Sequence, residues 1–327
     1  MVSASHVLDR VLVLEMVRVT EAAAVAASRL VGRGDEKAAD HAAVEAMRAA
    51  LNTLDFDGTV VIGEGERDEA PMLYIGEKVG AAQGRGPRID IALDPLEGTT
   101  LTAHGAPNAL AVLAIAEEGG LLNAPDVYMD KLAIGPGFPA GLIDLNSTPS
   151  DNIRAVARAK GVEPGEINVC VLDRPRHEAL IRELRGLGCG IHLIRDGDVS
   201  GVIAVTNPET TIDVYMGSGG APEGVLAAAA LRCVGGQFQG RLLFRNEDEI
   251  ARAHRWGVSE LDRIYHLEDL AKGDCIFAAT GVTDGSMLGG VKRRKDCITT
   301  ESVVMRASSG TVRWVKGQHR HEPGLES

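Results

Sequence analysis

An almost continuous apolar segment from Ala109 to Ala116 places the strongest constraint on how this chain folds. A strand that is apolar at successive positions has no polar side to turn to water, so it is buried on both faces. The second half of the chain alternates short apolar segments with helical ones. The predicted strands there are 168–172, 190–194 and 212–216, and the predicted helices are 176–187 and 222–234. Such alternation indicates an α/β layered fold in which helices cover the sheet.

Two helices are predicted before the first strand, over residues 7–31 and 37–54. The second carries an apolar stripe that includes Val44, Met47 and Leu51, and the stripe extended backwards contains Asp40. An unpaired carboxylate on an apolar face is costly. Asp40 is therefore either hydrogen-bonded near the start of this helix or part of a functional site.

Two further carboxylates follow short strands. Glu64 comes just after the β-branched segment 59–62, and Asp94 comes directly after 89–93. If the two strands are adjacent, both carboxylates lie at one edge of the sheet, where open α/β sheets bind ligands. Clustered carboxylates repel one another unless cations lie between them, and a set of oxygen ligands favours Mg²⁺ or Mn²⁺ over zinc. The pattern predicts a divalent-metal site.

The hexapeptide Asp-Pro-Leu-Glu-Gly-Thr at 94–99 carries the most specific signal. Pro95 restricts the backbone after the aspartate, and Glu97 follows three residues after Asp94, so a turn would aim both carboxylates at one metal pair. Gly98 lets the backbone approach a phosphate closely, and Thr99 adds a hydroxyl there. The hexapeptide predicts a metal-dependent phosphatase.

The other polar segments have two interpretations each. Arg174 and Arg176 are either a binding pair for a non-reacting phosphate or surface arginines at a helix start. Asp196 and Asp198 either accept hydrogen bonds from sugar hydroxyls or form a turn. Residues 217–220 are predicted as a turn before a helix, and 119–149 as loops with short strands. The segment that starts at Gly217 does not match the dinucleotide-binding motif G-x-G-x-x-G, because Pro222 occupies its sixth position.

Composition excludes several classes of protein. The net charge of −12 over 327 residues argues against binding to nucleic acid or to an anionic membrane. The five cysteines are dispersed, which suits a reducing compartment and makes a zinc site improbable. There is no apolar run of about 18 residues and no signal peptide, so we expect a cytoplasmic protein without a membrane span.

Short motifs in order along most of the chain resemble the class II, GlpX-type bacterial fructose-1,6-bisphosphatases, within the lithium-sensitive phosphatase superfamily that includes inositol monophosphatases. In the first half the matching stretches are 32–35, 39–40, 43–44, 46–48, 62–66, 68–74, 94–95 and 97–99. In the second half they are 123–126, 128–129, 175–177, 196–199, 219–220, 222–224 and 279–282. In one departure Glu36 precedes Lys37 where the family often has lysine directly after aspartate, so the resemblance assigns no role to Lys37.

The resemblance implies roles for particular residues and Mg²⁺ or Mn²⁺ as cofactor. The implied metal ligands are Asp40, Glu64, Asp94, Glu97 and Glu223. Thr99 and Asp68 would position or activate the attacking water, with Glu64 as the third catalytic residue. The implied substrate contacts are Glu97, Gly98, Thr99, Tyr128, Arg174, Pro175, Arg176, Asp196, Gly197, Asp198 and Gly220, and His177 is a further candidate.

By the same resemblance, we expect a layered αβαβα sandwich of the sugar-phosphatase type, in which the active site lies between two subdomains. The expected subdomains are a metal-binding, catalytic one over 1–150 and a substrate-binding one over 151–327 that contributes Glu223. The expected reaction is hydrolysis of fructose-1,6-bisphosphate by a homo-oligomer, a dimer or tetramer. Three alternatives stand beside it: a sedoheptulose-1,7-bisphosphatase or dual-specificity enzyme, a catalytically silent sugar-phosphate-binding regulatory protein, and a Rossmann oxidoreductase.

Overall fold

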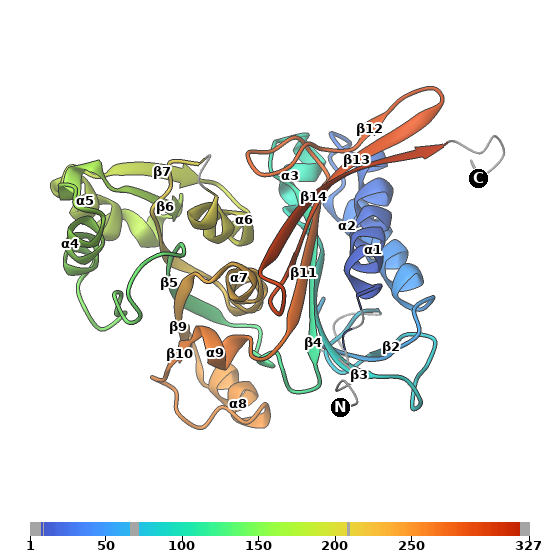
Figure 1. Cartoon of the computed structure of the whole chain (residues 1–327), viewed down its shortest axis with the longest axis horizontal. Coiled ribbons are helices and arrows are strands. Elements are labelled where there is room, and N and C mark those ends of the chain that lie inside the picture. The colour runs from blue at the N-terminus through green and yellow to red at the C-terminus, as the bar shows by residue number, and fades with distance from the viewer. Residues whose placement is uncertain (1–7, 9, 66–71, 208–209, 321–327) are drawn as a thin grey trace. The chain divides into compact units, whose positions relative to one another are not determined.

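The computed structural model describes residues 8, 10–65, 72–207 and 210–320, and they form two compact units (Figure 1). The first unit takes its described residues from 1–118, 276–306 and 311–327, and the second from 119–275 and 307–310. Each unit combines one sheet with helices. The predicted α/β class is therefore confirmed.

The division between the units differs from the expected boundary at residue 150. Residues 119–150 belong to the second unit because β5, Tyr128–Ile134, pairs with two strands of that unit. The chain then returns to the first unit from residue 276, where β11, Cys275–Gly281, lies beside β4, Leu110–Glu117. Strand pairing over long sequence separations decides this division, and local sequence patterns do not report such pairing.

The first unit contains an eight-stranded sheet in the order β12-β13-β11-β4-β3-β1-β2, and β14, outside this order, pairs with the whole length of β13. The strands β1 and β3 are parallel neighbours, as the predicted site requires. Seven of the eight residues of β4 are buried, so the strand predicted to be buried on both faces is confirmed. The strands are β1 Asp57–Ile62, β2 Lys78–Val79, β3 Arg88–Glu97, β4 Leu110–Glu117, β11 Cys275–Gly281, β12 Lys292–Arg293, β13 Cys297–Arg306 and β14 Thr311–Arg320.

Two long helices, α1 (Leu12–Ala27) and α2 (Glu36–Leu51), lie side by side along this sheet (Figure 1). They bury their apolar stripes against alternate residues of the central strands, among them Ile91 of β3 and Leu113 of β4. Asp35 caps the second helix by accepting a hydrogen bond from the Ala38 N–H, 2.9 Å away. The short helix α3, Thr99–His104, follows β3. Both predicted N-terminal helices are confirmed.

The second unit contains a six-stranded sheet in the order β10-β9-β5-β8-β6-β7. Strand β6 is parallel to β7 and β8, and the other pairs are antiparallel. Helices α4 and α5 pack against apolar residues of β5, β6 and β8. The strands are β5 Tyr128–Ile134, β6 Asn168–Leu172, β7 Gly190–Ile194, β8 Val214–Gly220, β9 Gln237–Leu243 and β10 Ile264–His266. The helices are α4 Pro149–Lys160, α5 Glu178–Gly186, α6 Asp198–Ile203, α7 Ala221–Val234, α8 Glu247–Arg255 and α9 Leu267–Leu270.

One sequence prediction in this unit was confirmed and another was wrong. Residues 119–149 are mostly loops around one short strand, as predicted, and that strand, β5, is central in the sheet. Residues 217–220 are not a turn: they continue β8 and pair with Lys131 back to Tyr128 of β5. Gly219 and Gly220 let the side chains of Asp198 and Glu223 approach the strand backbone closely. In the part of the chain that the structure describes, no helix has the length and apolar character needed to cross a membrane.

Candidate active site

Glu64 is held just beyond the end of β1 by its own backbone. Its N–H donates to the carbonyl of Leu73, 3.1 Å away. The two segments approach this closely because residue 63 is glycine: a Cβ on Gly63 would lie 2.0 Å from the Leu73 carbonyl oxygen. Residue 63 must therefore be glycine for the two segments to pack together, and this packing fixes the backbone position of Glu64.

Asp40, on α2, lies close enough to Glu64 for the two charges to interact. Burial is the main reason that the pKa of Glu64 rises from 4.5 to about 8, and the negative charge of Asp40 raises it further. Burial also raises the pKa of Asp40, against a lowering effect of His41. Both carboxyl groups therefore resist ionisation, and a cation placed beside them would favour their ionised forms.

The hexapeptide at 94–99 is not the simple turn expected from its sequence. Strand β3 runs through it to Glu97, and the register with β4 shifts between Asp94 and Glu97. Pro95 falls in this irregular stretch, where a residue without an N–H is tolerated. Asp94 Oδ1 accepts a hydrogen bond from the Leu96 N–H at 3.0 Å, and the side chain of Glu97 is buried. Asp94 and Glu97 keep their partners on β4, Val112 and Leu110, and the irregularity lies between them.

Gly98 changes the direction of the chain after β3. Its φ of +91° lies in the left-handed region that favours glycine, and helix α3 begins at Thr99. Only Gly98 therefore separates the hydroxyl-bearing Thr99 from the strand that carries Asp94 and Glu97. Asp68, the other residue expected to act on the attacking water, lies outside the described residues.

The five implied metal ligands belong to both units. Asp40, Glu64, Asp94 and Glu97 are in the first unit and Glu223 is in the second. Within the ranges that the structure describes, no three His, Cys, Asp or Glu side chains are grouped so as to hold a metal ion. The pair that the structure brings together is Asp40 and Glu64. Its donors are carboxylate oxygens in a partly buried setting, which suits a hard divalent cation.

In the second unit, Asp198 and Glu223 share a buried lysine that the sequence interpretation missed. Lys131 Nζ lies 2.5 Å from Asp198 Oδ2, and both residues are buried. Burial and the charge of Asp198 raise the pKa of Glu223 to about 7, whereas Lys131 lowers it. The Oε2 atom of Glu223 is buried without a hydrogen-bond partner among the described residues. The sequence signal for Lys131 is a lysine within the otherwise apolar second half of β5.

Two glycines at the end of β8 make room for these carboxylates. A Cβ on Gly219 would lie 2.0 Å from Asp198 Oδ2, and one on Gly220 would lie 2.0 Å from Glu223 Oε2. Gly220 is opposite Tyr128 in the β5–β8 ladder. Thus three of the expected site positions, Gly220, Glu223 and Asp198, are neighbours of one strand end.

The structure also brings Tyr128 and Arg176 together. The guanidinium carbon of Arg176 lies 4.9 Å from the centroid of the Tyr128 ring. Arg176 Nη2 donates to the carbonyl of Ser218 at 2.7 Å, and its Nε lies 3.0 Å from the Ser218 hydroxyl. A second guanidinium, that of Arg245, lies 5.0 Å from the same ring and was not among the expected site residues.

The remaining expected contacts occupy the connections after β6 and β7. Arg174 precedes the short turn that begins at Pro175, and its Nη2 lies 3.9 Å from Asp196 Oδ1. Asp196 is followed by Gly197, whose φ of +82° precedes the start of α6 at Asp198. The arginine pair and the aspartate segment are thus linked within one unit.

His177 is buried, and both nitrogens of its imidazole ring are hydrogen-bonded to the backbone. Its Nδ1 lies 2.8 Å from the carbonyl of Leu172, and its Nε2 accepts a hydrogen bond from the Ser218 N–H, also at 2.8 Å. These bonds indicate the Nδ1–H form, and burial lowers the pKa of the imidazole below 6.5. His177 therefore holds the backbone of Ser218, the β8 residue to which Arg176 donates its hydrogen bonds.

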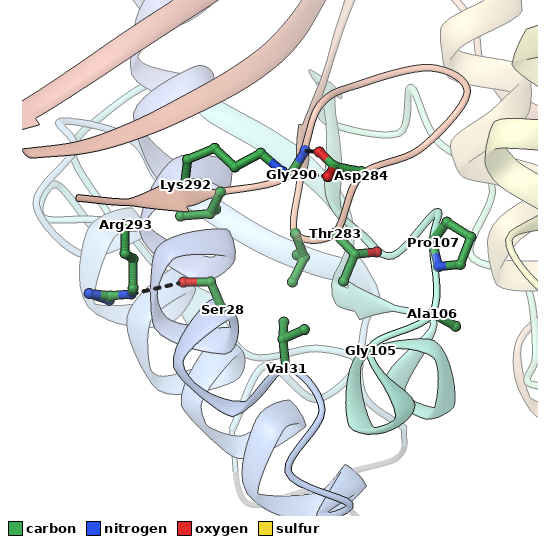
Figure 2. Close-up of a pocket in the computed structure, with 12 residues that line it drawn as sticks. Ser28, Val31, Gly105, Ala106, Pro107, Thr283, Asp284, Gly290, Lys292 and Arg293 are labelled. Atoms are coloured by element: carbon green, nitrogen blue, oxygen red, sulfur yellow. Dashed lines mark hydrogen bonds and ion pairs between the residues drawn. The ribbon is translucent and has the colours of Figure 1, made fainter.

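A separate cavity of about 430 Å³ lies in the first unit (Figure 2). Its charged side chains are already engaged: Lys292 pairs with Asp284, and Arg293 donates to Ser28 and to the carbonyl of Val25. None of the expected site residues lines it. The lining residues are Ser28, Val31, Gly105, Ala106, Pro107, Val282, Thr283, Asp284, Gly290, Val291, Lys292 and Arg293.

Comparison with known proteins relates the whole chain to one family. The family described as "Bacterial fructose-1,6-bisphosphatase, glpX-encoded" matches residues 10–319. The chain is 48% identical to fructose-1,6-bisphosphatase 1 class 2 of Escherichia coli K12, over 97% of this chain and 98% of that protein. It has the same identity and coverage with fructose-1,6-bisphosphatase class 2 of Shigella flexneri.

Solved structures that match the chain are more distant. They include the extragenic suppressor protein SuhB of Bartonella henselae, with a TM-score of 0.33 and 17% identity over 61% of this chain and 74% of that one. An inositol monophosphatase from Anabaena has a TM-score of 0.31 and 17% identity over 60% and 72% of the two chains.

Proposed function

Because the chain belongs to the glpX-encoded bacterial fructose-1,6-bisphosphatase family, we propose that it hydrolyses fructose-1,6-bisphosphate to fructose-6-phosphate and inorganic phosphate. It is then a phosphoric monoester hydrolase. The observation that carries the proposal is the family match over residues 10–319, together with 48% identity to class 2 relatives along nearly their full length. No observation favours the sedoheptulose-bisphosphate, silent regulatory or oxidoreductase alternatives.

The reaction depends on a divalent metal, which we propose to be Mg²⁺ or Mn²⁺. The proposed ligands are Asp40, Glu64, Asp94, Glu97 and Glu223. The raised pKa values of Asp40, Glu64 and Glu223 support this set, because each carboxylate needs a nearby positive charge to ionise fully. When bound, such ions lower the pKa of a water molecule and neutralise charge on the phosphoryl group.

The chain's own residues position the two reactants. We assign to Thr99 and Asp68, with Glu64, the task of holding the attacking water in line with the phosphorus atom. Water then adds to phosphorus while the bond to the sugar oxygen breaks, without a phosphoenzyme. We further assign substrate contacts to Glu97 and Gly98.

The second unit supplies the contacts that distinguish a bisphosphate from a simple phosphate ester. We assign the phosphate that is not cleaved to Arg174, Pro175, Arg176 and Tyr128, and the sugar hydroxyls to Asp196, Gly197, Asp198 and Gly220. The support is the guanidinium of Arg176 over the Tyr128 ring and the pairing of Gly220 with Tyr128. We further propose that the enzyme is cytoplasmic and forms a homo-oligomer, a dimer or tetramer. Light scattering of the purified protein would test the oligomeric state.

The deciding experiment measures phosphate release from fructose-1,6-bisphosphate with Mg²⁺, with Mn²⁺ and with chelator. We expect turnover with at least one metal and none after chelation. Sedoheptulose-1,7-bisphosphate and inositol monophosphate serve as parallel substrates. Tight binding of fructose-1,6-bisphosphate without phosphate release in either metal would contradict the proposal and support the silent regulatory alternative.

A further inference from the structure

Arg245 extends from the end of β9 toward the same aromatic ring as Arg176. Leu243, the last residue of β9, is opposite Tyr128 in the ladder with β5, and Arg245 follows two residues later. The guanidinium carbon of Arg245 lies 5.0 Å from the Tyr128 ring centroid, beside the 4.9 Å distance for Arg176. Tyr128 and Arg245, more than 100 positions apart in the sequence, are thus brought into contact.

A buried carboxylate holds the Arg245 side chain in place. Its Nε donates to Glu249 Oε1 at 2.7 Å, its Nη2 lies 2.6 Å from the same oxygen, and its backbone N–H donates to Oε2. The side chain of Glu249 is 1% exposed, whereas that of Arg245 is 61% exposed. Asn246 caps α8 by accepting a hydrogen bond from the Glu249 N–H. Arg245 is therefore fixed at one edge and open to solvent at the other.

The open edge retains hydrogen-bonding capacity. A guanidinium has five N–H groups, and Nη1 of Arg245 donates to no described residue. Arg176, by contrast, already uses Nε and Nη2 on Ser218. Two guanidinium groups lie around one ring, and Glu249 offsets the charge of only one of them, so the pair retains a net positive charge. A dianionic phosphate ester is the ligand that such a pair matches in charge and geometry.

We propose that Arg245 is a substrate-binding residue, which donates hydrogen bonds to the phosphate that the reaction leaves on the sugar. It acts with Arg176 and Tyr128, and Glu249 is its positioning residue. This rests on the proposed function, since the retained phosphate is that of fructose-6-phosphate. Arg245 would therefore help the enzyme to select bisphosphates over monophosphate esters.

The test compares Arg245→Met with a matched control, Arg263→Met. Arg263 has the same kind of environment, because its guanidinium carbon lies 4.9 Å from the Tyr265 ring and its Nη2 lies 2.6 Å from Asp269 Oδ1. We expect Arg245→Met to raise KM for fructose-1,6-bisphosphate and the inhibition constant of fructose-6-phosphate by roughly ten- to a hundredfold, with kcat changed less than about twofold. The control should change neither constant.

A substrate without the second phosphate separates binding from a merely structural role. With fructose-1-phosphate, Arg245→Met should keep the wild-type kcat/KM, because the group that it contacts is absent. Equal losses on both substrates, or an unchanged KM for the bisphosphate in a folded variant, would overturn the proposal. If Arg245→Met does not fold, Arg245→Lys keeps the charge while losing the planar fork, and it should raise the same KM to a smaller extent.

Failure of the proposed function would be recognised separately. If the wild-type enzyme releases no phosphate from fructose-1,6-bisphosphate, the hydrolytic assignment is wrong. Calorimetric titration with fructose-6-phosphate still tests Arg245 in that case. Weaker binding by Arg245→Met than by wild type and Arg263→Met supports the assignment of Arg245, and equal binding by all three excludes it.

Discussion

The ammonium group of Lys131 and the carboxylate of Asp198 form a buried ion pair, with Nζ 2.5 Å from Oδ2. Lys131 is on β5 and Asp198 is the first residue of α6, so the pair joins elements 67 residues apart. The side chain of Lys131 is 0% exposed. A lysine this deeply buried is tolerated because a carboxylate compensates its charge.

Removing the lysine charge should therefore destabilise the protein strongly. We expect Lys131→Met to lower the free energy of unfolding by about 3–5 kcal/mol, because it leaves Asp198 buried beside Glu223 without its cation. Urea denaturation measures this loss. The matched control is Lys292→Met, whose partner Asp284 is exposed, and it should cost far less. Equal losses in the two variants would contradict a special role for burial, and adding Asp198→Asn to Lys131→Met should recover part of the stability.

The Asp40–Glu64 pair predicts how stability depends on pH in protein treated with chelator. The folded-state pKa of Glu64 is raised from 4.5 to about 8, so the folded protein holds this proton more tightly than the unfolded chain does. The resulting stabilisation is complete below pH 4.5 and is lost as the pH rises toward 8. The slope for one group is at most about 1.4 kcal/mol per pH unit.

Glu64→Gln should flatten this part of the stability curve, whereas Glu45→Gln, at an exposed position on α2, should leave it unchanged. Thermal unfolding at a series of pH values measures both. Saturating Mg²⁺ or Mn²⁺ should remove the loss in wild type, because a bound cation replaces the proton. In activity assays Glu64→Gln should show no turnover while remaining folded, and near wild-type turnover would exclude Glu64 from the site.

Gly220→Ala tests whether the position of the Glu223 carboxylate matters. The backbone angles of Gly220, φ −64° and ψ 142°, are open to alanine, but the new Cβ would lie 2.0 Å from Glu223 Oε2. The flexible glutamate side chain has to move, so we expect a folded protein with metal-dependent activity reduced about tenfold or more. Gly186→Ala, with nothing near its added Cβ, is the control for kinetics and melting temperature. Unchanged activity in Gly220→Ala would remove Glu223 from the proposed ligand set.

His177 predicts a loss of stability at acidic pH. Burial lowers its pKa in the folded state, so its stabilising contribution is present above pH 6.5 and is lost as the pH falls through the folded-state value. Protonation would put a hydrogen on Nε2, which accepts the Ser218 N–H. His177→Gln should remove this acidic decline. Nitrogen chemical shifts in NMR should report the Nδ1–H form at neutral pH, and the opposite form would contradict the assigned hydrogen bonds.

Local sequence patterns were sufficient for several parts of the fold and site. The apolar run at 109–116 forms a buried strand. This was predictable because successive apolar residues indicate a strand that is buried on both faces. The helix stripe singled out Asp40 and the strand end singled out Glu64, and the structure brings these two carboxylates close enough for their charges to interact. The metal-binding roles of all five carboxylates remain predictions.

The sequence by itself therefore determined the α/β class, the family and the residue types from which a phosphate-ester site is built. Only the tertiary structure decided that Lys131 neutralises Asp198, that Arg245 reaches Tyr128, and that the last strands return to the first sheet. The reason is physical: these features join side chains or strands that are distant in the sequence. A local pattern reports which face of a strand is buried, but the partner on that face is chosen by the packing of the whole chain.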